Sequence, residues 1–289
     1  MDCASDKGDI LQLTMNYRVI SSLFATLIVF SSFAFGQQQN LNPYKPGEQL
    51  TYVGKYKLIG ISFTVADLEF KVSQTPDGTN YVINSKAESR GTLIKLFSFS
   101  FLQRFESVID AQKLHILKTV KRDEQSSRIR DSEAVFDYDT HTVTWTETDP
   151  TDSSRQPRRV ASSITDDMQD IVSAVYMLRT MPMAVGETVY VNVSDSGMVY
   201  NIPVKITERE EKKSIIGKRM CFKLEPDIFG EGKFVEQNGK LEIWMTDDEK
   251  RIPVSAKLGT KLGSVEISLS GTIQNTVFGD SNTLKNSDK

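Results

Sequence analysis

The sequence predicts a mainly β protein whose large antiparallel sheet curves into a half-open or closed barrel around one inserted helix. Three observations lead to this fold class. Apolar and polar residues alternate with a period of two in many short segments, which is typical of strands with one buried face. Short turns join most of these segments, so neighbouring strands should run antiparallel. One segment, at 166–181, instead carries apolar residues at helical spacing around most of its circumference.

The chain begins with the composition of an export signal. A stretch of about seventeen almost wholly apolar residues, 19–35, follows Arg18 and ends at the small residues Ala34 and Gly36. A positive charge, then an apolar stretch, then a pair of small residues is the pattern of a secretory signal peptide. The sequence therefore predicts a signal peptide at 15–36. A transmembrane anchor is the alternative, but the apolar stretch is at the lower limit of length for a span.

Cleavage is expected near Gly36–Gln37, which would leave the mature protein in the periplasm or outside the cell, without a membrane span. Met15 is the expected initiator, and 1–14 is then a non-native upstream extension. Residues 37–46 are polar, contain two prolines and are expected to form a linker.

Composition excludes several classes of function. The formal net charge is -3, whereas a nucleic-acid binder normally has a basic excess. Two histidines and two cysteines leave little for zinc, haem or iron–sulfur ligation, so we expect no metal and no cofactor. Cys221 is the single cysteine of the mature chain. A buried thiol in a strand is the expected state, and a disulfide between two chains is the alternative.

The β domain is expected at 47–273, with about twelve strands, and 274–289 is expected to be a disordered polar tail. Turn residues such as Pro76 and Gly78 separate the first strands. The strands predicted before the helix are Leu50–Leu58, Ala66–Val72, Tyr81–Ala87, Phe101–Ile109, His115–Glu124, Arg128–Phe136 and Thr142–Thr148. The strands predicted after it are Glu187–Val193, Val199–Thr207, Lys218–Glu225, Phe234–Thr246, Ile252–Leu258 and Val265–Ile273.

The helix is predicted at 166–181, after an exposed connection at 150–165. Asp166 is the expected N-cap, with Gln169 three residues later as in a capping box. Pro182 is expected to end the helix. Because the helix is apolar on most sides, it should lie against or inside the concave side of the sheet.

Three motifs together resemble a known family. The domain opens with Tyr44-x-Pro46-Gly47-Glu48-x-Leu50-x-Tyr52. The helix reads Asp170-Ile-Val-Ser173-Ala174-Val-Tyr176-Met-Leu178-Arg179, followed by Pro182 and Gly186-Glu187. Trp244-Met-Thr246-Asp247-Asp248 and Arg251-Ile252-Pro253-Val254 come near the end. This combination resembles the DUF3108 family of exported bacterial proteins over residues 44–272. The resemblance implies a secreted or periplasmic β-rich protein with an inserted helix, and it provides no catalytic residues.

Aromatic residues on one strand face suggest a ligand site. Phe97, Phe99 and Phe101 alternate along the chain and could line a pocket for an acyl chain or another apolar ligand. Ordinary core packing is the alternative and is favoured for such a stripe. Ser173 and Tyr176, with Gln169, form a narrow polar stripe on the helix that could contact a ligand or satisfy buried groups.

Two charged clusters are open to both functional and structural interpretations. Asp166, Asp167 and Asp170 could form a carboxylate site, but helix capping explains the first two. A basic group near two strands could bind phosphate, but acidic residues intersperse it, which favours a solvated sheet face. The basic residues are Lys118, Lys121, Arg122, Arg128 and Arg130.

These observations favour a non-enzymatic exported protein that binds a lipid or another apolar or amphipathic molecule in the sheet concavity. The alternative is an envelope protein that contacts a protein partner through edge strands or the loop at 150–165. A hydrolase is disfavoured because the sequence has no nucleophile–base motif.

Overall fold

The computed structural model describes residues 42–58, 60–91, 95, 99–235, 238–260 and 263–273. The predictions for the upstream extension, the signal peptide and the tail lie outside the described residues. The same holds for residues 37–41 of the linker and for Phe97.

Fourteen strands form one antiparallel sheet, in the order β8-β7-β6-β5-β4-β3-β2-β1-β14-β13-β12-β11-β10-β9. The prediction of a mainly β antiparallel fold is confirmed, with more strands than the twelve expected. The strands before the helix are β1 (Gln49–Leu58), β2 (Ile61–Gln74), β3 (Asn80–Ser89), β4 (Phe101–Asp110), β5 (Ile116–Gln125), β6 (Arg128–Asp137), β7 (Thr142–Thr148) and β8 (Arg158–Ser163). Those after it are β9 (Thr188–Asp195), β10 (Met198–Ser214), β11 (Gly217–Pro226), β12 (Lys240–Thr246), β13 (Pro253–Thr260) and β14 (Gly263–Ile273).

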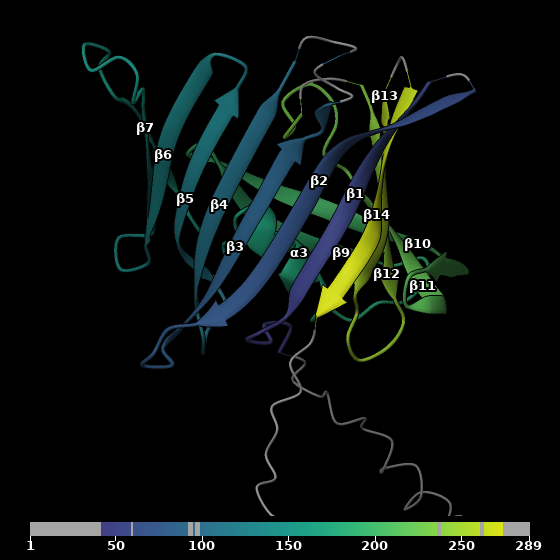
Figure 1. Ribbon diagram of the computed structural model, residues 1–289. Coiled ribbons are helices and arrows are strands. Elements are labelled where there is room, and N and C mark those ends of the chain that lie inside the picture. The colour runs from purple at the N-terminus through teal and green to yellow at the C-terminus, as the bar shows by residue number, and fades with distance from the viewer. Residues whose placement is uncertain are drawn as a thin grey trace, which may run out of the picture. The chain divides into compact units, whose positions relative to one another are not determined.

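The sheet curves around helix α3, the one helix named among the described residues (Figure 1). It is not closed, because β8 and β9 stand at the two ends of the strand order. Strand β8 still contacts the turn between β9 and β10, where the Ser162 hydroxyl donates a hydrogen bond to the Gly197 carbonyl at 2.7 Å. Of the two predicted alternatives, the half-open barrel describes the sheet.

Strand β8 corrects the prediction that residues 150–165 are only an exposed connection. Val160 pairs with Trp145 of β7, and the Arg158 guanidinium lies 5.6 Å from the Trp145 ring centroid. The strand forms because β7 offers an unpaired edge, although its own sequence has only one large apolar residue. Local alternation could not reveal such a strand.

Helix α3 spans Ile171–Leu178 and is shorter than the predicted 166–181. Asp170, not Asp166, is its N-cap, and Asp170 forms the capping box with Ser173. Residues before the helix are extended because they pair with strands: the Gln169 N–H donates to the Asn192 carbonyl at 2.9 Å, and the Met168 carbonyl accepts from the Ile116 N–H. These long-range bonds override the local helical pattern.

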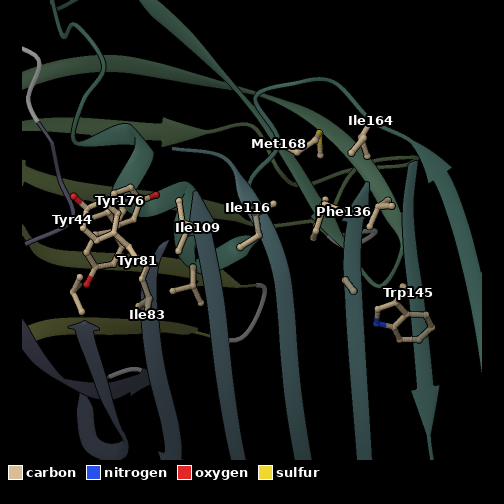
Figure 2. Close-up of a cluster of buried hydrophobic side chains, with 14 residues drawn as sticks. Tyr44, Tyr81, Ile83, Ile109, Ile116, Phe136, Trp145, Ile164, Met168 and Tyr176 are labelled. Carbon is tan, nitrogen blue, oxygen red and sulfur yellow. The ribbon is translucent and has the colours of Figure 1, made fainter. Parts of the chain in front are cut away.

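The largest hydrophobic cluster joins α3 to the inner face of the sheet, the face against which the helix lies (Figure 2). Ile83 of β3, Ile109 of β4 and Ile116 of β5 are fully buried there, together with Met168 before the helix. A second cluster packs β9–β12 against Leu178. Cys221 of β11 is fully buried with a free thiol, and burial raises its pKa to about 11.

Candidate functional site

The N-terminus of α3 is fixed to strands β4 and β5 by one buried carboxylate. Asp170 accepts hydrogen bonds from the Ser107 hydroxyl at 2.5 Å and from the Thr119 hydroxyl at 2.7 Å. It also accepts from the Ser173 backbone N–H at 2.7 Å. Because Asp170 is only 2% exposed, these bonds replace water around its charge.

The residue that follows α3 is held by a buried ion pair. Arg179 donates to both carboxylate oxygens of Glu48, at 2.6 and 2.9 Å, and it also donates twice to the Lys250 carbonyl. The two side chains are 2% and 1% exposed. Burial alone would lower the pKa of Arg179, but the hydrogen bond and charge of Glu48 raise it above the ordinary value. Glu48 therefore ties the start of the domain to the end of the helix.

Three tyrosines stack between the sheet and this ion pair. Tyr44 lies between Tyr81 and Tyr176 (Figure 2), and its ring centroid is 5.3 Å from that of Tyr81 and 5.6 Å from that of Tyr176. The Arg179 guanidinium is 5.1 Å from the Tyr176 ring centroid. Burial raises the pKa of Tyr44 and Tyr176, so both hydroxyls stay neutral. Neither hydroxyl has a hydrogen-bond partner among the described residues. The cluster contains Tyr44 of the opening motif and Tyr176 and Arg179 of the helix motif. Its geometry could not be predicted from these motifs.

An apolar cleft of about 480 Å³ lies on the inner face of the sheet, between residues of β1, β2, β3, β4 and β14. We use the name apolar cleft for the cavity lined by Gly54, Tyr56, Val65, Ala66, Leu68, Ala87, Phe99, Phe101, Val265 and Ile267. A smaller inner pocket of about 160 Å³ shares Leu68 and Ile267 with it. Tyr52, Tyr176 and Arg179 line this inner pocket. The shared residues make the two cavities neighbours on one apolar surface.

The residues predicted to bind a ligand do not lie together in one cavity of the structure. Phe99 and Phe101 line the apolar cleft, and Tyr176 lines the inner pocket. Ser173 is fully buried in the helix cap and lines none of the cavities described here. Gln169 precedes the helix, so the predicted polar stripe on one helix face is wrong at this residue; its amide nitrogen donates to the Leu114 carbonyl.

A polar chamber of about 120 Å³ lies on the other side of the helix N-terminus, against strands β4–β7. We define it by its lining of Phe105, Thr119, Lys121, Asp123, Arg128, Arg130, Ser132, Ala134, Trp145, Glu147, Asp170, Ile171, Ser194, Asp195 and Ser196. Asp123 is central and 7% exposed. Desolvation would raise its pKa, but hydrogen bonds from Gln103 and Gln125 and the charges of Lys121 and Arg128 hold it below the ordinary value.

The predicted basic patch is therefore not one solvated face. Lys121, Arg128 and Arg130 line the polar chamber. Lys118 and Arg122 instead carry half-exposed side chains that pair with carboxylates of the neighbouring strand, Glu133 at 2.6 Å and Asp131 at 3.1 Å. The reason is strand geometry, since residues three apart in a strand point to opposite faces.

The predicted acidic cluster is also dispersed. Asp167 accepts hydrogen bonds from Thr165 and Asn192, whereas Asp166 is largely exposed and lies 3.5 Å from His141. Within the described part of the chain, no group of three or more His, Cys, Asp or Glu side chains is placed to hold a metal ion. No helix of that part is long and apolar enough to span a membrane.

Comparison with known proteins identifies a family but no activity. The family described as "Protein of unknown function (DUF3108)" matches residues 50–270. No curated protein matches the chain.

Solved structures show a related fold. The crystal structure of a β-barrel-like protein of the DUF1849 domain of unknown function, from Brucella abortus, superposes with a TM-score of 0.56 at 9% sequence identity. The match covers 80% of this chain and 98% of that one.

Two further matches are weaker. A candidate lipoprotein from Parabacteroides distasonis has a TM-score of 0.31 at 8% identity, covering 81% of this chain and 98% of that one. A candidate exported protein with a YmcC-like fold, from Bacteroides fragilis, has a TM-score of 0.28 at 10% identity, with the same coverage. Scores at this level do not establish a shared fold.

Proposed function

Because the chain belongs to the DUF3108 family, whose function is unknown, we propose a function from the geometry of its own cavities. The protein is an exported, non-enzymatic binding protein that holds an apolar or amphipathic molecule in the concavity beside α3. The apolar cleft is the observation that carries this proposal. Its volume of about 480 Å³ lies within the usual range for small-molecule sites, roughly 300–1,000 Å³.

The arrangement of α3 supports binding rather than simple core filling. The helix is anchored at both ends by buried charged groups, Asp170 and Arg179. It nevertheless leaves the inner pocket beside it, and this pocket shares Leu68 and Ile267 with the apolar cleft. Burying an acyl chain there contributes about 0.8 kcal/mol per methylene group, so a long chain supplies enough free energy for stable binding.

The proposed location follows from the apolar segment at 19–35 and its small-residue ending. An apolar or amphipathic ligand in that location would come from the cell envelope. The lining of the apolar cleft contains no catalytic pair of nucleophile and base. A screen of the purified protein for esterase and glycosidase activity tests the absence of catalysis, and turnover lost on mutation of a cavity Asp or Ser would contradict it.

The binding test is native mass spectrometry with lipid extraction on residues 37–289 purified from an envelope fraction. A co-purifying acyl species is expected, and Ala87→Trp, which fills the apolar cleft, should abolish it. Lys86→Trp is the matched control, since Lys86 directly precedes Ala87 in β3, is absent from the lining of the apolar cleft and forms an ion pair with Glu88. The proposal would be refuted if the wild-type protein carried no bound lipid and also failed to take up added acyl chains.

One observation favours a second candidate, an envelope protein that contacts another protein through edge strand β9. Tyr190 of β9 is 59% exposed and Met198, at the start of β10, is 50% exposed. Gln169 pairs with β9 only at Asn192 and Ser194, beyond Tyr190. Sheet edges with exposed apolar side chains are templates for strand addition. Cross-linking through a photoreactive residue at Tyr190 in intact cells tests it, and an absence of cross-linked protein would count against it.

A further inference from the structure

We propose that the polar chamber binds the acidic headgroup, a carboxylate or a phosphate, of the molecule whose apolar part lies in the apolar cleft. This inference rests on the proposed function and adds the class of ligand. The ligand is an amphipathic acid that reaches from one side of α3 to the other along the inner face of the sheet.

The first argument is the composition of the inner face of β5–β7. Inner positions of a curved sheet are normally apolar, because charged groups lose their hydration there. Here Asp123 pairs in register with Arg130 across β5 and β6, and with Gln103 across β4 and β5. Three polar residues at neighbouring inner positions, two of them charged, are costly for folding alone. A binding role accounts for their presence on this face.

The second argument is that each unpartnered polar group of the chamber can donate a hydrogen bond. Arg130 Nε and the Ser194 hydroxyl are buried and have no partner among the described residues. Lys121 forms none of the ion pairs found in that part of the chain, and its ammonium lies 5.0 Å from the Phe105 ring centroid. Free donors of this kind match the oxygens of an anion.

Four carboxylates line the chamber, and each has a partner of its own that reduces its repulsion of an anion. Glu147 lies 3.9 Å from Arg128, and Asp195 accepts a hydrogen bond from the Ser196 hydroxyl at 3.1 Å. Asp123 is neutralised by Arg128 at 3.0 Å and accepts from two glutamine amides. Asp170 is saturated by hydroxyl and backbone donors at the helix cap. Arg130 pairs with Asp149 through Nη1 at 2.5 Å, which leaves its Nε for another partner.

The third argument is continuity along β4. Phe101 lines the apolar cleft, and Phe105 lines the polar chamber. Both face inward because they are four residues apart in one strand, and four residues span about 13 Å. An acyl chain of ordinary length covers this distance. One molecule can therefore occupy both cavities.

The test compares dodecanol, dodecanoic acid and dodecyl phosphate at pH 8, each measured by displacement of an apolar fluorescent dye from the mature protein. Wild-type protein should bind the two acids about tenfold more tightly than the alcohol, as one charge-assisted contact provides. The better of the two acids identifies the headgroup chemistry. Lys121→Met should remove the preference without weakening the binding of dodecanol, and Ser194→Ala should reduce it.

Lys118→Met is the matched control, because Lys118 lies on the same strand, pairs with Glu133 and is absent from the chamber lining. It should leave the preference unchanged. Equal affinity of the wild-type protein for all three compounds would refute this inference and leave the proposed function standing. An unchanged preference in Lys121→Met would refute it as well. Failure of all three compounds to bind would instead refute the proposed function, and this inference with it.

Discussion

The inner face of the sheet has two halves that share one geometry and differ in chemistry. In the apolar half, Tyr52 of β1 pairs with Leu68 of β2 and Leu269 of β14. In the polar half, Asp123 of β5 also faces inward, and its cross-strand neighbours are Gln103 and Arg130. Strand alternation places all these side chains inside. It does not decide whether the inside serves as core or as a binding surface.

Helix α3 stands where the two halves meet. Its N-cap, Asp170, lines the polar chamber, whereas Tyr176 and Arg179 line the inner pocket of the apolar half. Both ends are fixed by buried charged groups, and these contacts hold the helix in place while leaving cavities on both sides. We therefore expect the contacts of Asp170 and Arg179 to control the stability of the fold. The residues that line the cavities should control ligand binding.

The largest expected effect comes from breaking the anchor on the apolar side. Glu48→Ala leaves Arg179 charged and buried without its carboxylate partner, because the Arg179 side chain is only 2% exposed. Removing one partner of such a pair costs about 3–5 kcal/mol. Urea unfolding of the mature protein should show this loss as a lower midpoint.

Two variants serve as controls for the Glu48 result. Glu133→Ala breaks the half-exposed pair with Lys118 and should cost no more than about 1 kcal/mol. Combining Glu48→Leu with Arg179→Met replaces the buried pair by apolar residues and should recover most of the stability. A Glu48→Ala loss as small as that of Glu133→Ala would show that the pair does not anchor the helix.

The second prediction separates core from cavity wall on a single strand. Ile109 of β4 is fully buried, and Ile109→Ala should destabilise the protein by about 2–5 kcal/mol. Phe101, on the same inner face of β4, lines the open apolar cleft. Phe101→Ala should cost less stability than Ile109→Ala but weaken the binding of an apolar dye. Equal stability losses with unchanged dye binding would make the cleft an ordinary part of the core.

Sequence alternation located most strands because its period is a local property of the chain. The prediction of Leu50–Leu58 differs from β1 by one residue. Local alternation does not predict structural features that depend on contacts between residues far apart in the sequence. The start of the helix was wrong because Gln169 pairs with the backbone of β9, and β8 was missed because its main partner is the edge of β7.

The candidate site was predictable to a similar extent. Alternation predicted that Phe99 and Phe101 share one face, and both line the apolar cleft. The pair formed by Glu48 and Arg179 joins residues 131 positions apart, and no local pattern shows such a contact. The polar chamber is not evident from the basic patch, because the patch groups five basic residues by their nearness in sequence. Strand geometry places Lys118 and Lys121 on opposite faces.

The third prediction concerns the anchor on the polar side. Asp170→Asn keeps the size of the N-cap but removes the charge that accepts bonds from Ser107, Thr119 and Ser173. We expect a loss of about 1–3 kcal/mol, which thermal or urea unfolding can measure. Asp166→Asn is the control from the same acidic cluster, and it should change little because the Asp166 side chain is 81% exposed. Equal effects would restore the sequence-based choice of Asp166 as the cap.

The smallest expected effect tests the polar half through its pH dependence. The pKa of Asp123 is lowered in the folded protein, so its ionised form stabilises the fold above the unfolded pKa of about 3.9, and this stabilisation disappears as pH falls through the folded pKa. Asp123→Asn should therefore cost about 1 kcal/mol between pH 5 and 8. The difference from wild type should shrink below about pH 4. Unfolding free energies measured in urea from pH 3 to 8 give this curve. If the difference stayed constant down to pH 3, Asp123 would stabilise the fold through the packing of its side chain and not through its charge.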